Sequence, residues 1–170
     1  KQLAPKRVVV FAPTKLVELI AASKFGKSNN NAINIRRLDS TADEVERLRV
    51  IEEFNQGVAN VLICTDRASR GLDFTNIDTV ISTSFPPPSP TAAETFVHRA
   101  GRAGRAGKDG ECITLMDSAH DGEMQSKKMI ESSVHVLFRP LAVTVGADQV
   151  EIAKHLEDLV IMKKIKINKK

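Results

Sequence analysis

The sequence contains no tryptophan and no tyrosine, and phenylalanine alone supplies its aromatic content of 4%. Proteins that hold RNA by stacking its bases need exposed aromatic rings, so this composition argues against a base-stacking platform. Cysteine is also scarce: Cys64 and Cys112 are the only two, and each lies inside an apolar run. So sparse a set gives little support for a disulfide framework or a metal site and predicts two buried structural thiols.

Long apolar runs are missing as well. No stretch approaches the roughly 20 apolar residues that a membrane-spanning helix needs, and residues 1–7 lack the apolar region of a secretory signal. We therefore expect an intracellular protein without membrane association. The 170 residues suffice for one globular core, and a net charge of +4 permits an anionic partner without naming it.

Short apolar runs alternate with amphipathic stretches along most of the chain. Strands are predicted at residues 7–12, 33–38, 61–64, 79–82 and 111–116, and helices at residues 16–25, 41–54, 91–98 and 118–130. Two helices begin on Thr-x-x-Glu capping boxes, at Thr41 and at Thr91. This alternation predicts an α/β fold with a mostly parallel sheet and helices on both faces, in which ligands bind beyond the carboxyl ends of the strands.

Three arginines, Arg99, Arg102 and Arg105, recur at every third position with only alanine and glycine between them. Each guanidinium presents a planar fork of donors that matches phosphate oxygens, and glycine lets a backbone approach a ligand closely. Taken alone, the segment predicts either a phosphate-binding turn or a solvated basic loop. Both interpretations stay open at this point.

The phosphate-binding interpretation is favoured when two segments are taken together: residues 61–73, VLICTDRASRGLD, and residues 98–107, HRAGRAGRAG. The two segments resemble motifs V and VI of the DEAD-box RNA helicases of superfamily 2. Residues 9–15, VVFAPTK, are similar to motif IV, and EVER at 44–47 with FNQG at 54–57 is similar to the Q-x-x-R and F-x-x-G segments. The resemblance covers residues 7 to about 116. It implies a C-terminal RecA-like domain over residues 1–132, followed by an extension over 133–170 with an amphipathic helix and a basic tail.

The resemblance implies a role for each matching residue. Arg102 and Arg105 would be arginine fingers that reach the γ-phosphate of ATP, a contribution typically worth about 10³–10⁵ in rate. Gly71 and Asp73 would also contact the nucleotide, the carboxylate by accepting a hydrogen bond from the ribose. The alternative for Asp73 is a turn residue without a ligand.

RNA contacts are implied for Thr14, Arg47 and Thr65, which would touch the backbone and not the bases. His98 and Arg99 would couple motif VI to its neighbouring motifs. Thr14 is equally interpreted as a helix cap, and Arg47 as the partner of Glu44 in a surface ion pair one helical turn away. Glu44 also replaces the glutamine usual in the family, which weakens the prediction of an RNA clamp on this helix.

Two parts of a complete helicase are not found in these residues. FGKS at 25–28 ends like a P-loop, but Ala21 stands where its first glycine is required, and the segment closes a helix when it should open one. An Asp-Glu-Ala-Asp box is also missing. ATP and its Mg²⁺ would therefore be held mainly by an N-terminal RecA-like domain of the same protein, and the chain alone is expected to be inactive.

Two other functions stay open: half of a superfamily 2 DNA helicase, and a non-catalytic RecA-like module that binds RNA or protein. His98 favours the RNA branch, because RecQ-like DNA helicases usually carry glutamine there. FRPL at 138–141 resembles the region that follows the core in nucleolar Gu-type helicases, which suggests a nuclear or nucleolar location. The last helix is a candidate contact for a protein partner or a second copy.

Overall fold

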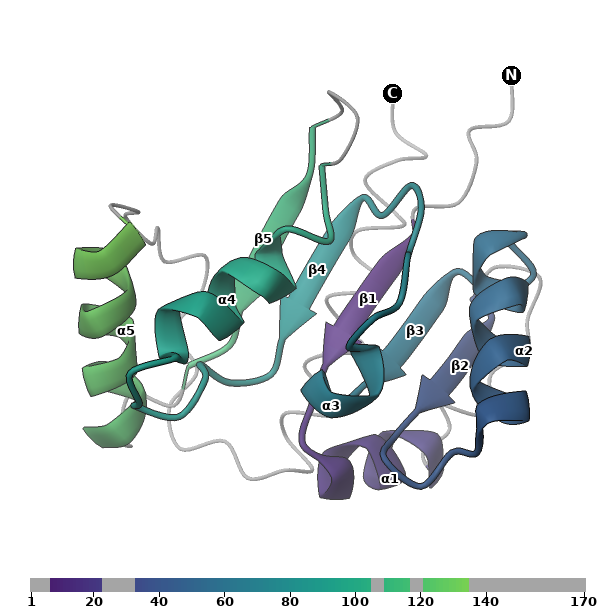
Figure 1. Cartoon of the computed structure of the whole chain (residues 1–170), viewed down its shortest axis with the longest axis horizontal. Helices are drawn as coiled ribbons and strands as arrows, with labels where there is room; N and C mark the ends of the chain where they lie inside the picture. Colours follow the sequence, from purple (N-terminus) through teal and green to yellow (C-terminus); the bar gives the residue numbers. More distant parts are fainter. Residues whose placement is uncertain (1–6, 23–32, 105–108, 117–120, 135–170) are drawn as a thin grey trace.

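The computed structural model describes residues 7–22, 33–104, 109–116 and 121–134 (Figure 1). Its elements are β1 (Val8–Phe11), α1 (Thr14–Ala22), β2 (Ile35–Leu38), α2 (Glu44–Asn55), β3 (Val61–Cys64), α3 (Asp66–Ser69), β4 (Thr79–Ser82), α4 (Ala92–Ala100), β5 (Glu111–Thr114) and α5 (Asp121–Val134). All five predicted strands are present. The P-loop-like FGKS, Arg105 and the final predicted helix lie outside the described residues, as does most of the predicted extension over 133–170.

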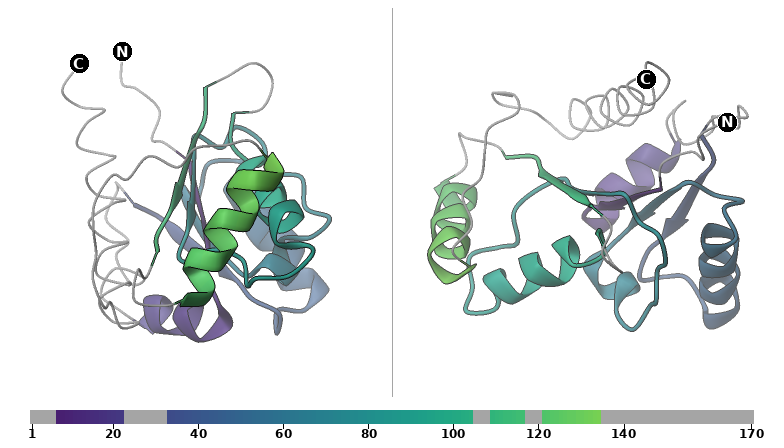
Figure 2. Two further views of the ribbon diagram at one scale, coloured as in Figure 1. Left: turned by 90° about the vertical axis from the view of Figure 1, so that its left-hand side faces the viewer. Right: turned by 90° about the horizontal axis from the view of Figure 1, so that it is seen from above.

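The five strands form one parallel sheet in the order β2-β3-β1-β4-β5. Helix α1 covers one face, whereas α2, α3 and α4 lie on the other (Figures 1 and 2). The predicted fold class is therefore confirmed. None of the helices in the described part of the chain is long and apolar enough to cross a membrane.

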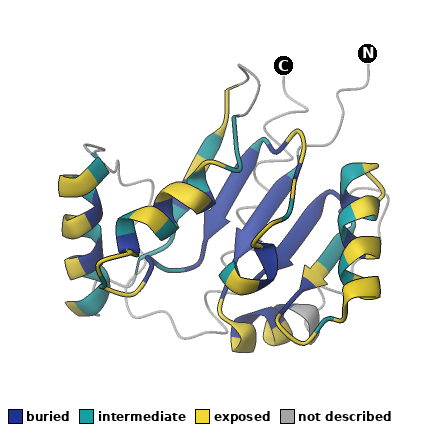
Figure 3. Ribbon diagram, in the orientation of Figure 1, coloured by how far each residue is buried: buried dark blue, intermediate teal, exposed yellow. Residues whose placement is uncertain are grey.

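Side chains alternate between the two faces of the sheet along each strand, and this divides the core into two layers. The central strands are buried on both faces (Figure 3). Val8 and Val10 of β1 pack toward α1, while Val9 and Phe11 pack toward α2. Strands covered on both faces need apolar residues at every position, which is why they read as continuous apolar runs in the sequence. A third cluster, Phe85, Phe96 and Ile130, joins the loop after β4 to α4 and α5.

The two cysteines differ in environment. Cys64 at the end of β3 is fully buried, and burial raises the pKa of its thiol to about 12. Cys112 is exposed on β5, so the prediction of two buried thiols is wrong for this residue. β5 is at the edge of the described sheet, and alternate residues of a strand face opposite sides. Ile113 packs in the core layer that includes α1, and Cys112 lies on the opposite face of this edge strand.

The predicted capping box at Thr41 is wrong. Helix α2 begins at Glu44, and the side chain of its N-cap residue Asp43 accepts a hydrogen bond of 2.8 Å from the backbone N–H of Glu46. Thr41 instead donates its backbone N–H and its hydroxyl to the carboxylate of Asp39, and this bonding lowers the pKa of that carboxyl. A short side chain that bonds within a turn competes with capping of the next helix.

The other capping box correctly places the start of α4, because Thr91 is its N-cap residue. Its side chain makes no capping hydrogen bond, and its hydroxyl lies 3.3 Å from that of Ser89. The sequence pattern therefore located this helix start without predicting its hydrogen bonds.

These two N-caps give a matched test of the structure. We expect Asp43→Ala to lower the free energy of unfolding by about 1 kcal/mol, because an amide of the first turn loses its acceptor. Thr91→Ala should cost only a few tenths of that amount, since no capping bond is lost. Urea denaturation of both variants measures the difference. Equal losses would contradict the assignment of Asp43 as the bonded cap.

Candidate functional site

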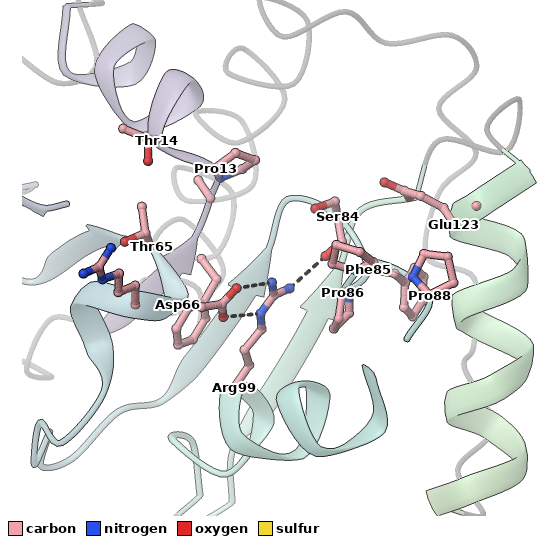
Figure 4. A pocket seen from close by; sticks show the side chains of 15 residues that line it. Pro13, Thr14, Thr65, Asp66, Ser84, Phe85, Pro86, Pro88, Arg99 and Glu123 are labelled. Carbon is pink, nitrogen blue, oxygen red and sulfur yellow. Dashed lines mark hydrogen bonds and ion pairs between the residues drawn. The ribbon is translucent and has the colours of Figure 1, made fainter. Parts of the chain in front are cut away.

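The carboxyl ends of β1, β3 and β4 open into a pocket of about 580 Å³ (Figure 4). Its walls come from five places: the start of α1, the segment after β3, the loop at 84–88, Arg99 of α4 and the first turn of α5. Parallel α/β sheets bind ligands at this edge, where loops from several strands meet. The pocket is therefore the first candidate site.

Both threonines predicted to contact RNA line this pocket. Thr14 is the first residue of α1 and is exposed, and the carbonyl of Pro13 before it accepts the backbone N–H groups of Leu16 and Val17. Thr65 is buried and caps α3 by accepting the backbone N–H of Ala68 at 3.2 Å. A hydroxyl that accepts one bond keeps its own hydrogen as a donor. Both side chains can therefore offer a donor to an anion.

A bidentate ion pair lies at the centre of the pocket (Figure 4). Arg99 donates from Nε to Oδ1 of Asp66 at 2.7 Å and from Nη2 to Oδ2 at 2.6 Å, and its Nη1 donates to the carbonyl of Ser84 at 3.0 Å. Its guanidinium also lies 5.6 Å from the ring centroid of Phe11. Arg99 thus joins α4 to the segment after β3 and to the loop after β4, and its coupling role stays a prediction.

Asp66 follows β3 in the motif V segment, and sequence reasoning missed it as the partner of Arg99. The two residues are 33 positions apart, and only the Thr-Asp pair that closes β3 hints at the carboxylate. His98, the other predicted coupling residue, is exposed on α4, with Nε2 3.9 Å from Oε1 of Glu94 in the same helix. Its coupling role stays a prediction.

Arg102 lies just after α4 and is partly buried. Its Nη1 donates to the carbonyl of Leu72 at 2.6 Å, and its guanidinium lies 5.8 Å from the ring centroid of Phe74. Gly104, with a positive φ of 70°, continues the turn and donates its backbone N–H to Ile77 at 3.4 Å. The motif VI segment is thus attached to the motif V segment at a second place.

Two side chains of α2 hold the same motif V segment from its other side. Arg47 donates from Nη2 to the carbonyl of Arg70, and Asn55 donates from Nδ2 to the carbonyl of Asp73 at 3.1 Å. The geometry thus gives Arg47 a structural partner other than Glu44. Contact of Arg47 with RNA stays a prediction.

Three residues predicted to bind nucleotide, Gly71, Asp73 and Arg102, meet at this segment. Gly71 has a positive φ of 72°, which side chains disfavour, so the turn itself requires glycine. Asp73 is exposed, and Arg102 holds the carbonyl between the two residues. The exposed carboxylate can accept a hydrogen bond from a ribose hydroxyl, and the partly exposed guanidinium can donate hydrogen bonds to a phosphate. This donor and acceptor set fits ATP.

Comparison with known proteins identifies the family. The model of the Helicase conserved C-terminal domain matches residues 1–107. The ATP-dependent RNA helicase DRS1 of Pyricularia oryzae is 36% identical over 115 residues, which are 68% of this chain and 14% of that protein. Nucleolar RNA helicase 2-A of Xenopus laevis is 33% identical over 137 residues, 81% of this chain and 17% of that protein. The chain therefore spans less than a fifth of the length of these relatives.

Solved structures show the same fold. The Escherichia coli DEAD-box protein SrmB, determined with the regulator of ribonuclease activity A, is 28% identical with a TM-score of 0.62 over 77% of this chain and 74% of that one. A DEAD-box protein from Methanococcus jannaschii is 26% identical with a TM-score of 0.64 over 80% of this chain and 35% of that one. The chain belongs to the Helicase conserved C-terminal domain family, and it resembles DEAD-box proteins in sequence and in its RecA-like fold.

Proposed function

We propose that this chain is the C-terminal half of an ATP-dependent RNA helicase core, which supplies arginine fingers to ATP and backbone contacts to RNA. The observation that supports this most directly is the double attachment of the motif VI segment to the motif V segment. Arg99 bonds Asp66 inside the pocket, and Arg102 bonds the carbonyl of Leu72, which lies between Gly71 and Asp73. One short segment thus contacts both candidate ligand sites.

On the nucleotide side, bound ATP supplies a γ-phosphoryl group whose oxygens gain charge during hydrolysis. Arg102 and Arg105 stabilise that charge, and Asp73 accepts a hydrogen bond from the ribose. The phosphate cradle and the ligands of Mg²⁺ belong to the N-terminal RecA-like domain. Arginine fingers presented from a second domain act only when the two domains close.

On the RNA side, Thr14 and Thr65 donate their hydroxyl hydrogens to phosphate oxygens, with Arg47 contributing from α2. Contacts of this kind position a strand without reading its sequence. Because Arg99 ties the pocket to α4 and Arg102 ties the following turn to the nucleotide side, domain closure around ATP changes both sites together. That coupling connects hydrolysis to local strand separation.

The proposal also includes the partners and the location. The N-terminal RecA-like domain of the same protein is the obligatory partner, and the C-terminal helix is a candidate contact for a protein or a second copy. One relative carries the name of a nucleolar helicase, which supports a nuclear or nucleolar location for this protein.

Two activity measurements test the proposal. The purified 170-residue chain is expected to show negligible ATP hydrolysis, because it lacks the cradle, whereas the full-length protein should hydrolyse ATP in the presence of RNA. The full-length protein should also displace a strand from an RNA duplex faster than from a DNA duplex. ATP turnover by the 170 residues, or a preference for DNA, would contradict it.

A further inference from the structure

Arg67 is a charged residue of the pocket for which the helicase motifs assign no role. It lines the pocket, is exposed and lies two residues after Thr65 in the motif V segment. Its neighbour Asp66 already shares two hydrogen bonds with Arg99 and so needs no second cation. Within the described ranges, no hydrogen bond or ion pair engages the Arg67 guanidinium. An exposed guanidinium without a paired carboxylate attracts an anion.

The charges of the pocket are unevenly distributed. Thr14 and Thr65 lie on one side, the Asp66–Arg99 pair lies in the middle, and Glu123 of α5 lies on the opposite side near Pro88 (Figure 4). The central pair is close to neutral as a unit, because carboxylate and guanidinium are joined by two bonds of 2.6–2.7 Å. The hydroxyl side therefore carries the positive charge of Arg67, whereas Glu123 on the α5 side takes part in an interaction of its own.

We propose that Arg67 binds an RNA phosphate beside Thr14 and Thr65. This contact holds the RNA backbone against the ends of β1 and β3. The inference rests on the proposed function, since it assumes that RNA enters this pocket. It adds a cationic contact to a pocket in which the predicted RNA contacts were the hydroxyls of Thr14 and Thr65 alone.

The salt dependence of RNA binding tests the contact of Arg67. Each cation that neutralises a phosphate of a single strand contributes about 0.7 to the slope of log K against log salt concentration. In the full-length protein, Arg67→Gln should reduce this slope by about that amount and weaken binding of a short single-stranded RNA about tenfold at low salt. Arg49→Gln is the matched control, because Arg49 is an exposed arginine of α2 outside the pocket, paired with Glu53 at 3.0 Å.

Thr14→Val separates this inference from the function on which it rests, because Thr14 is exposed and its loss removes a donor without disturbing the core. If Thr14→Val weakens RNA binding while Arg67→Gln behaves like Arg49→Gln, the pocket binds RNA and only the role of Arg67 is wrong. If Thr14→Val and Arg67→Gln both leave affinity and salt slope unchanged, RNA does not use this pocket, and the proposed RNA contacts fail as well. Melting temperatures of the variants check that each remains folded.

Discussion

Arg102→Ala in the full-length protein should lower kcat for RNA-stimulated ATP hydrolysis by about 10³-fold or more, the loss typical of a removed arginine finger. The physical reason is that a guanidinium aimed at the γ-phosphate stabilises charge that develops only in the transition state. KM for ATP should change much less, because the cradle of the other domain binds the ground state. Steady-state kinetics at saturating RNA measure both constants. Arg105→Ala should behave in the same way.

A purely structural role for Arg102 predicts a different pattern. Its Nη1 holds the carbonyl of Leu72 between Gly71 and Asp73, so loss of the side chain could simply displace the residues that contact the ribose. KM for ATP would then rise while kcat stayed within a few-fold, and Arg102→Lys would restore much of the activity by supplying one donor. Unchanged kcat in both Arg102→Ala and Arg105→Ala would favour the non-catalytic module.

Asp66→Asn should lower the free energy of unfolding of the chain by about 3 kcal/mol, because it leaves the buried Arg99 guanidinium without a charged partner. Arg99 is 8% exposed at its side chain, so it cannot regain water when its partner becomes neutral. Asparagine also places an amide donor where one of the two bonds needs an acceptor. Urea denaturation followed by circular dichroism measures the loss.

Two variants serve as comparisons for that measurement. Arg99→Met should cost less, about 1–2 kcal/mol, because the Asp66 side chain is 40% exposed and can be hydrated once its partner is gone. Lys127→Gln breaks a partly exposed i,i+4 pair of α5 with Glu131 at 3.7 Å and should cost about 0.5 kcal/mol or less. If Asp66→Asn were as mild as Lys127→Gln, the pair would contribute no more than a surface contact.

Sequence patterns predicted the structure correctly where the conformation of a residue depends on the helix or strand to which it belongs. The apolar run VVVF predicted β1 correctly, because a strand covered on both faces leaves no polar position. Gly57 marked the end of α2 for a similarly local reason: its φ of 78° suits a residue without a side chain. Both features can be recognised from the residue types of one short segment.

Prediction failed where the outcome depended on the surroundings of a residue in the folded chain. Thr41 has the residue type and spacing of a cap, but the Asp39 carboxylate takes its hydroxyl, and Asp43 caps the helix. Cys112 has the apolar neighbours of a buried thiol, but its strand lies at the edge of the described sheet. A capping pattern or an apolar run indicates the structure that a residue favours. It does not indicate which groups surround that residue in the folded chain.

By itself, the sequence determined the alternation of strands and helices, the helicase motifs and the residue types available for phosphate and nucleotide. Only the tertiary structure decided that Asp66 is the partner of Arg99, that Leu72 is held by Arg102, and that Arg67 and Glu123 lie in one pocket. These pairings join residues brought together by the strand order and by the packing of α4 and α5. Periodicity along a chain carries information about the face that a residue occupies, whereas a contact between distant residues depends on how separate elements are stacked.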